Sequence, residues 1–190
     1  HVFNRAIAGS LLFREEGNYL YFLTKMDQYL PDAAELLGYC LMPNHYHFLL
    51  RLTSEGFSKA MQRLGISYAL AYNNFYNQKG HVFQGTFRRK QANDLNYLLH
   101  LSRYIHLNPV KANLVDAPED WPFSSYLGYI GLRKPYHYNP QSILDMVCDQ
   151  PDATLDSKQK AYQVFVQEWD FDYMEIKGIK TIFTPPRPGM

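Results

Sequence analysis

The string Met42-Pro-Asn-His-Tyr-His-Phe-Leu-Leu50 places two histidines one residue apart in a run of strand-forming residues. Alternate side chains of a β-strand point to the same face, so His45 and His47 can hold one divalent cation between two imidazole rings. Such a pair also occurs as ordinary strand histidines that make only local hydrogen bonds. The motif therefore indicates metal chemistry only if other suitable groups face it.

A tyrosine and an asparagine farther along the chain are suitable groups. Tyr104 and Asn108 are four residues apart, so they share one face of a helix. If that helix covers the open sheet face, Tyr104 faces the histidines and Asn108 can add an oxygen ligand. Mixed nitrogen and oxygen ligands suit Mg²⁺ or Mn²⁺, whereas zinc sites usually have thiolates or a third histidine. The alternative for Tyr104 is a packed aromatic, because the chain has 16 tyrosines.

The hydrophobic pattern predicts the elements that must position these residues. We expect strands at residues 1–5, 36–42, 45–52 and 82–91, and helices at 19–30, 57–75, 95–109 and 157–169. The first seven elements, in the order strand, helix, strand, strand, helix, strand, helix, predict an α+β fold. This fold is a ferredoxin-like split βαβ antiparallel sheet with an appended helix, which carries Tyr104 across the open sheet face.

Single residues predict where the helices begin and end. Pro31 ends the first helix, Ser54 caps the second, and Asn93 or Asp94 caps the third. Pro109 is expected to disturb or end the third helix, and it also disfavours α geometry at the residue before it. The second helix carries an apolar stripe at helical spacing, which consists of Phe57, Ala60, Met61, Leu64, Tyr68, Ala71, Tyr72 and Phe75.

Composition limits the class of protein. The chain has 190 residues, of which 46% are hydrophobic and 19% charged, so it favours one folded domain over a disordered segment. Its two cysteines, Cys40 and Cys148, are too few for a disulfide framework and suit a reduced, cytoplasmic protein. No apolar stretch is long enough to span a membrane. We expect a monomer or a homodimer.

A net charge of +1 gives only weak support for a nucleic-acid partner, but phosphate binding needs only a local basic patch. In a strand, Arg88 and Lys90 point to one face and Arg89 points to the other, so only Arg88 and Lys90 can contact the same DNA surface. A solvated edge strand explains this run equally well.

Other cations and histidines have weaker signals. Arg103 and Lys111 flank Tyr104 and are candidate DNA contacts, although helix-surface charges fit the same pattern. Arg5 is a further candidate for DNA or for the site. His106 lies about 200° around an ideal helix from Tyr104, so we do not assign it as a ligand. His81 and His100 are expected to be structural or surface histidines.

The first string, together with Arg103-Tyr-Ile-His-Leu-Asn-Pro-Val-Lys-Ala112, resembles the REP-associated tyrosine transposases. These are single-tyrosine HUH transposases with an IS200-like transposase domain. The resemblance extends through the strings at residues 80–85 and 121–126, Gly-His-Val-Phe-Gln-Gly and Trp-Pro-Phe-Ser-Ser-Tyr. It covers residues 1–130, which we expect to form the transposase-like domain. Residues 131–190 are then a C-terminal extension, partly helical with a mobile tail.

The resemblance implies roles for individual residues. His45 and His47 match the metal-binding pair, Tyr104 matches the nucleophile, and Asn108 matches the polar residue that completes the metal site. It also implies the ferredoxin-like fold, with the tyrosine on the helix that follows the last strand. Members of the family act on single-stranded DNA beside short palindromic repeats that fold into hairpins.

Two positions depart from the family. Thr86 stands where members often carry arginine, and Asn113 stands where they often carry glycine. These departures bear on DNA contacts rather than on the chemistry.

Three functional hypotheses follow. The leading one is metal-dependent cleavage and strand transfer of single-stranded DNA, through a 5′-phosphotyrosine link to Tyr104. The alternative is a domesticated relative that binds repeat hairpins without cutting them. In a third, water replaces Tyr104 as the nucleophile of a metal-dependent hydrolase. A covalent protein–DNA adduct separates the first hypothesis from the other two.

Overall fold

The computed structural model describes residues 1–150 and 152–168. The site-bearing half consists of β1 (Val2–Arg5), α1 (Glu16–Tyr29), β2 (Ala34–Met42), β3 (His45–Leu52), α2 (Phe57–Phe75), β4 (Arg88–Arg89) and α3 (Leu95–Lys111). It is followed by η1 (Pro118–Asp120), α4 (Tyr126–Tyr129), α5 (Gln141–Val147) and α6 (Leu155–Gln167). The helix predicted at 157–169 is confirmed as α6, but Trp169 and the tail at 184–190 lie outside the described residues. No helix in the described ranges is both long and apolar enough to cross a membrane.

The four strands form one antiparallel sheet in the order β2-β3-β1-β4. Placing β1 between β3 and β4 is the arrangement of a ferredoxin-like split βαβ sheet, so the predicted fold class is confirmed. The short turn at Pro43 and Asn44 joins β2 to β3 as a hairpin, and the register pairs Met42 with His45.

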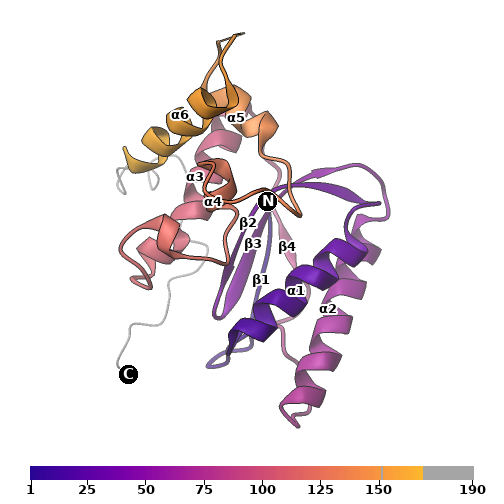
Figure 1. Cartoon of the computed structure of the whole chain (residues 1–190). Coiled ribbons are helices and arrows are strands. Elements are labelled where there is room, and N and C mark those ends of the chain that lie inside the picture. Colours follow the sequence, from indigo (N-terminus) through magenta and orange to yellow (C-terminus); the bar gives the residue numbers. More distant parts are fainter. Residues whose placement is uncertain (151, 169–190) are drawn as a thin grey trace.

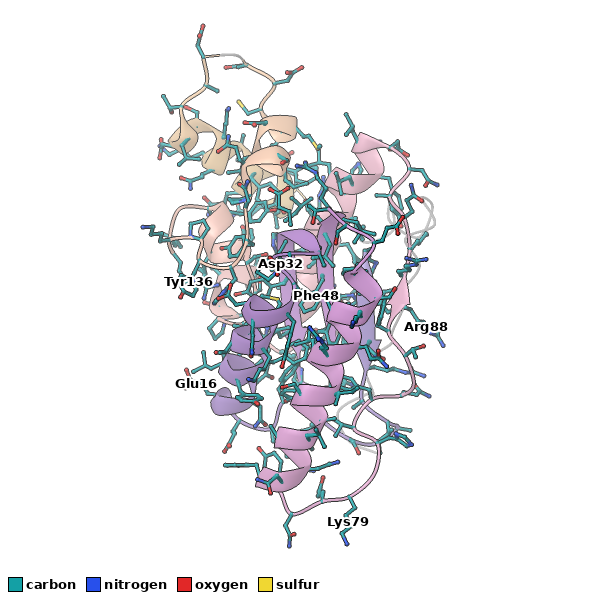
Figure 2. The ribbon with its side chains drawn as sticks, turned by 90° about the vertical axis from the view of Figure 1, so that its right-hand side faces the viewer. Glu16, Asp32, Phe48, Lys79, Arg88 and Tyr136 are labelled. Atoms are coloured by element: carbon teal, nitrogen blue, oxygen red, sulfur yellow. The ribbon has the colours of Figure 1, made fainter. Side chains whose placement is uncertain are left out.

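Two layers of helices cover the sheet. Helices α1 and α2 lie on one face and α3 lies on the other (Figure 1). Phe48, labelled in Figure 2, belongs to the core under α1 and α2, where its ring stacks on Phe22 with centroids 6.1 Å apart. The second core lies between the sheet and α3, and it also includes Ile143, Leu144, Tyr162 and Val166 of α5 and α6.

The predicted apolar stripe of α2 is largely buried, but both ends of the helix differ from the prediction. Gly56, not Ser54, is the N-cap, and no side chain caps this helix. The Ser54 hydroxyl instead accepts from the Gly56 amide and donates to the Asp32 carbonyl. Phe75 was expected in the core but is 69% exposed. Tyr72 and Tyr76 make the contacts of the last turn, through hydroxyls that bond to Leu11 and Asn18.

The strand predicted at residues 82–91 is mostly a loop, and β4 has only the residues Arg88–Arg89. Gly85, inside this range, has a φ angle of 75°, which interrupts an extended run. The loop is nevertheless held on β1. The Asn4 side chain donates to the Gly85 carbonyl at 3.2 Å, and Ala6 forms an isolated bridge with Phe83.

The outer edge of β2 is covered by the segment 121–126. The Leu41 amide donates to the Phe123 carbonyl, and the Ser125 amide donates to the Tyr39 carbonyl, each at 2.9 Å. The Trp121 indole also donates to the Leu41 carbonyl, at 3.0 Å. An exposed strand edge is thereby paired, which protects it from pairing with other chains.

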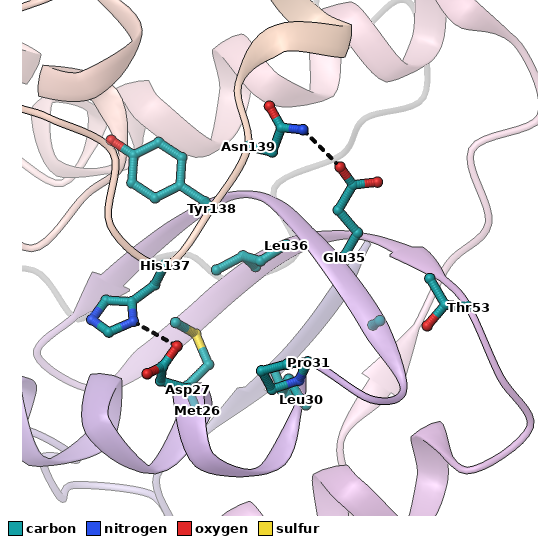
Figure 3. Close-up of a pocket in the computed structure, with 11 residues that line it drawn as sticks. Met26, Asp27, Leu30, Pro31, Glu35, Leu36, Thr53, His137, Tyr138 and Asn139 are labelled. Atoms are coloured by element: carbon teal, nitrogen blue, oxygen red, sulfur yellow. Dashed lines mark hydrogen bonds and ion pairs between the residues drawn. The ribbon is translucent and has the colours of Figure 1, made fainter.

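The segment 137–139 continues this cover toward α1 (Figure 3). His137 Nδ1 lies 2.9 Å from Asp27 Oδ1, and the Asn139 amide donates to Glu35 at 3.0 Å. These contacts border a cavity of about 310 Å³ that is also lined by Met26 of α1 and by Leu30, the C-cap of that helix. The cavity therefore lies on the α1 side of the sheet, away from the two strand histidines.

Helix α3 begins as predicted, because the Asp94 side chain accepts from the Tyr97 amide at 2.6 Å. It does not end at Pro109, which lies inside the helix. Proline lacks the N–H that would bond to the Ile105 carbonyl. The Asn108 side-chain amide lies 3.5 Å from that carbonyl and donates to the Tyr104 carbonyl at 2.7 Å. A side chain thus takes over part of the lost backbone bonding.

Asn113 ends α3 in the left-handed region, with a φ angle of 53°. The Asn113 amide donates to the Val110 carbonyl, and the Leu114 amide donates to the Pro109 carbonyl. These are the two bonds of a Schellman motif, which favours glycine or asparagine at this position. The preference for glycine at Asn113 therefore has a backbone origin.

Replacing Asn113 by alanine is expected to lower the free energy of unfolding by about 1 kcal/mol, because alanine adopts the left-handed conformation at a steric cost. Asn113→Gly is the matched control and should be at least as stable as the parent chain, since glycine adopts positive φ freely. Urea unfolding of the three chains measures the difference. Equal stability of the two variants would contradict this assignment.

Candidate active site

Two histidine rings lie side by side on the α3 face of β3. The centroids of His45 and His47 are 4.9 Å apart, with the rings at 85° to each other. Tyr46 and Phe48 belong to the core on the opposite face, as strand alternation requires. The two imidazoles therefore share one surface in the way the sequence predicts.

Both rings are buried, and His47 is 0% exposed. Burial, together with a smaller contribution from the positive charge of Arg5, lowers the pKa of His45 to about 4. Burial also lowers the pKa of His47 well below its usual value, with a smaller contribution from His45. Both imidazoles are thus neutral at neutral pH, which is the form that binds metal ions.

Tyr104 faces this pair from α3. Its ring lies edge-on to His47, with centroids 5.8 Å apart and an interplanar angle of 78°. The sequence predicts that Tyr104 faces the histidines from a separate element, and the geometry agrees. A nucleophile needs an accessible hydroxyl, but Tyr104 is only 3% exposed. The difference arises because α3 packs flat on the sheet, in a core that contains Leu101, Tyr104 and Ile105.

Asn108 lies one turn beyond Tyr104 and is buried. The helix backbone engages its amide nitrogen, through the bond to the Tyr104 carbonyl, so its oxygen is the end that can bind a cation. Within residues 1–150 and 152–168, no three His, Cys, Asp or Glu side chains form a metal-binding cluster. The two neutral imidazoles fit a divalent cation, but its remaining ligands would be an amide oxygen and substrate oxygens.

Two arginines lie on the same sheet face as the histidines. The cross-strand register aligns Cys40, His47, Phe3 and Arg88 in one row. Arg5 pairs with His45 in a neighbouring row, and Arg5 and Arg88 line one small hollow beside Phe3. Both arginines are exposed, and Arg88 projects from the sheet edge in Figure 2.

Arg89 pairs with Val2, which in turn pairs with Phe48 on the α2 face. This confirms that Arg88 and Arg89 point to opposite sides of the sheet.

The other predicted cations lie in different surroundings. Lys111 is close to the nucleophile candidate, with Nζ 5.9 Å from the centroid of the Tyr104 ring. Lys90 Nζ lies 5.1 Å from the ring of Tyr97. Arg103 is buried, and its guanidinium lies over Phe165 of α6 at 3.5 Å. Arg103 thus faces a helix rather than an open surface, and its role as a DNA contact stays a prediction.

Comparison with known proteins now adds to this geometry. The family model described as "Transposase IS200 like" matches residues 25–108. This segment of the chain is therefore similar to the IS200-like transposases. The matched segment runs from α1 to Asn108, so it contains both histidines and Tyr104.

A solved structure, described as the REP-associated tyrosine transposase bound to a REP hairpin, is similar to this chain. The TM-score is 0.54 at 23% sequence identity, and the match covers 73% of this chain and 82% of that one. This likeness supports the fold of the chain. No curated protein sequence matches the chain.

Sequence reasoning missed two side chains that contact His45 and His47. His1 Nε2 lies 2.9 Å from His47 Nδ1, and Asn44 Oδ1 lies 2.6 Å from His45 Nδ1. Asn44 precedes His45, so its contact was detectable from the turn. His1 is far from His47 in the chain, and no local pattern signals their contact.

A buried polar network holds the back of α3. His106 Nδ1 lies 2.7 Å from the Tyr162 hydroxyl, and His106 Nε2 lies 2.7 Å from the Ser125 hydroxyl. The Tyr162 hydroxyl also donates to Ser102, and Ser125 bonds to the backbone of Tyr39. His106 is thus a structural residue that joins α3 to α6 and β2, and this agrees with its exclusion as a ligand.

His106 should make the protein less stable in acid. Burial lowers its pKa from 6.5 to about 3, so below pH 6.5 the unfolded chain takes up a proton that the folded chain does not. Stability is therefore lost as pH falls from 6.5 toward 3. His106→Gln should reduce the slope of unfolding free energy against pH by about 1.4 kcal/mol per pH unit. Urea unfolding between pH 7 and pH 4 tests this, and an unchanged slope would contradict it.

Proposed function

We propose that this chain cleaves and rejoins single-stranded DNA through a covalent intermediate on Tyr104. The observation that carries the proposal is the placement of the Tyr104 ring, edge-on to His47 with centroids 5.8 Å apart. A nucleophile and a pair of neutral imidazoles come from separate elements to one sheet face. The transposase family of residues 25–108 supports DNA as the substrate. The hairpin in the similar solved structure supports hairpin-forming repeats as its binding site.

His45, His47 and the oxygen of Asn108 are the residues that would hold Mg²⁺ or Mn²⁺. When bound, such an ion polarises a non-bridging oxygen of the scissile phosphate and orients that phosphate. Arg5 and Arg88, exposed on the same face, bind neighbouring phosphates of the strand. Arg5 pairs with His45 across the sheet, and Arg88 lies in the same cross-strand row as His47. We therefore expect the DNA strand to run from the histidines across β1 and β4.

In the reaction, Tyr104 Oη forms a bond to the phosphorus and the bond from phosphorus to the 3′-oxygen breaks. The tyrosine loses its proton, and the leaving 3′-oxygen gains one as a 3′-hydroxyl. The product is a 5′-phosphotyrosine link, and the 3′-hydroxyl of a second strand reverses the step to rejoin DNA. A tyrosine hydroxyl is a weak nucleophile until it is deprotonated. Lys111, with Nζ 5.9 Å from the ring centroid, stabilises the phenolate charge.

The burial of Tyr104 adds a condition to this mechanism. With 3% of the residue exposed, a DNA strand reaches the hydroxyl only after the packing around it opens. Active-site contacts of this kind often form only with substrate bound. Two alternatives remain separate hypotheses: hairpin binding without cleavage, and cleavage by water in place of tyrosine. Neither produces a covalent adduct.

Tyr104→Phe is expected to abolish both cleavage and the adduct while it preserves folding and DNA binding, because only the hydroxyl is lost. The chain is incubated with Mg²⁺ or Mn²⁺ and a hairpin-bearing single strand from the region of its own gene. A label at the 3′ end stays with the protein, whereas a 5′ label leaves on the fragment with the free 3′-hydroxyl.

Tyr97→Phe is the matched control, since Tyr97 lies on the same helix and should be dispensable for the chemistry. An adduct mapped by peptide mass spectrometry to another tyrosine would overturn the assignment. So would cleavage by Tyr104→Phe at the parent rate.

The two neighbouring arginines of β4 provide a second test, because they point to opposite sheet faces. Arg88→Ala should weaken binding of single-stranded DNA and reduce the slope of log K against log salt by about 0.7, the value for one phosphate contact. Arg89→Ala removes the same charge from the other face and should change both quantities less. Fluorescence anisotropy at several salt concentrations measures them, and equal effects would place the DNA elsewhere.

A further inference from the structure

The Nδ1 edge of each histidine in the candidate metal site contacts another side chain. Asn44 Oδ1 lies 2.6 Å from His45 Nδ1. An amide oxygen only accepts hydrogen bonds, so His45 Nδ1 carries the proton in this contact and the ring lone pair lies on Nε2. Asn44 thereby selects the neutral form of His45 that is protonated on Nδ1.

His47 has the corresponding contact with His1, whose Nε2 lies 2.9 Å from His47 Nδ1. The His1 ring is 7% exposed and stacks on His47, with centroids 5.1 Å apart and an interplanar angle of 25°. Its other ring neighbour is Phe3, at 4.9 Å. If His1 Nε2 accepts, His47 Nδ1 carries the proton and its lone pair also lies on Nε2.

The backbone holds His1 in this place. The His1 nitrogen donates to the Lys90 carbonyl at 3.0 Å, and the Lys90 amide donates to the His1 carbonyl at 2.8 Å. This pair of bonds continues the ladder between β1 and β4, so the ring position is set by the sheet. Asn44 is similarly restrained, because its carbonyl accepts from the Ala6 amide at 2.8 Å.

We propose that Asn44 and His1 are positioning residues, which fix the Nδ1–H forms of His45 and His47 so that both rings present Nε2 to one divalent cation. This inference rests on the metal site of the proposed function. A metal-binding histidine usually donates its other ring N–H to a partner, which sets the tautomer and the orientation of the ring. Here one partner, Asn44, comes from the turn before β3, and the other, His1, is the residue that precedes β1.

The tautomers are measured first, in the metal-free chain labelled with ¹⁵N at histidine. Long-range ¹H–¹⁵N spectra distinguish protonated from unprotonated ring nitrogens, and both His45 and His47 should show an unprotonated Nε2. Asn44→Leu should leave His45 as a mixture of tautomers, and His1→Phe should do the same for His47 while it keeps a ring in the stack. A purely structural role would change stability but not these signals.

Mn²⁺ affinity is measured next, by electron paramagnetic resonance titration. Loss of the side chain that accepts from the other ring N–H of a metal-binding histidine typically weakens metal binding by about 10- to 100-fold. We therefore expect Asn44→Leu and His1→Phe each to weaken Mn²⁺ binding at least about tenfold. Asn44→Asp keeps an accepting oxygen and His1→Gln supplies one in place of the ring nitrogen, so both should recover most of the affinity. His81→Ala, an exposed histidine, is the control and should bind like the parent chain.

The outcomes separate this inference from the function on which it rests. If the parent chain binds Mn²⁺ and Asn44→Leu and His1→Phe bind it equally well, the positioning role is overturned and the metal site stands. If the parent chain shows both predicted tautomers but binds no Mn²⁺, the metal site falls and the proposal falls with it. An Nε2–H form of either histidine in the parent chain would refute the positioning role directly.

Discussion

The packing of α3 on one face of the sheet is the constraint on which the candidate site depends. Two polar rings, His45 and His47, lie in the middle of a strand face, where burial is unfavourable unless polar contacts compensate for it. Leu101 and Ile105 of α3 supply the apolar cover for this face. The same contact brings Tyr104 against His47 and keeps both imidazoles neutral. Helix α3 thus excludes water from the histidines and places Tyr104, the nucleophile candidate, beside them.

The rotation of α3 about its own axis is set from its other side. Both ring nitrogens of His106 contact hydroxyl groups, one on Tyr162 and one on Ser125. Rotation of the helix would leave these buried atoms without partners, which is costly in a medium of low dielectric constant. Since Tyr104 and His106 lie on the same helix, the network that holds His106 also fixes the direction of Tyr104. Helix α6 therefore contributes to the site without reaching it.

Local periodicity accounts for what could be predicted from the sequence. Alternation along β3 placed His45 and His47 on one face, and helical spacing placed Tyr104 on the covering helix. The predictions that failed depended on single residues with competing preferences. The strand expected at residues 82–91 is reduced to two residues, because Gly85 within it has a positive φ angle and interrupts the extended chain. Helix α3 continues through Pro109, because Asn108 replaces part of the missing backbone bonding.

By itself, the sequence determined the order of the elements, the shared face of the two histidines and the helix that carries Tyr104, because these follow from spacing between near neighbours. Only the tertiary structure decided the partners of those residues. His1 contacts His47, and Tyr162 contacts His106, across more than forty residues in each case. It also decided that Tyr104 is buried. Contacts between distant segments leave no periodic pattern in the chain, so they are defined only when the sheet register and the helix packing bring the segments together.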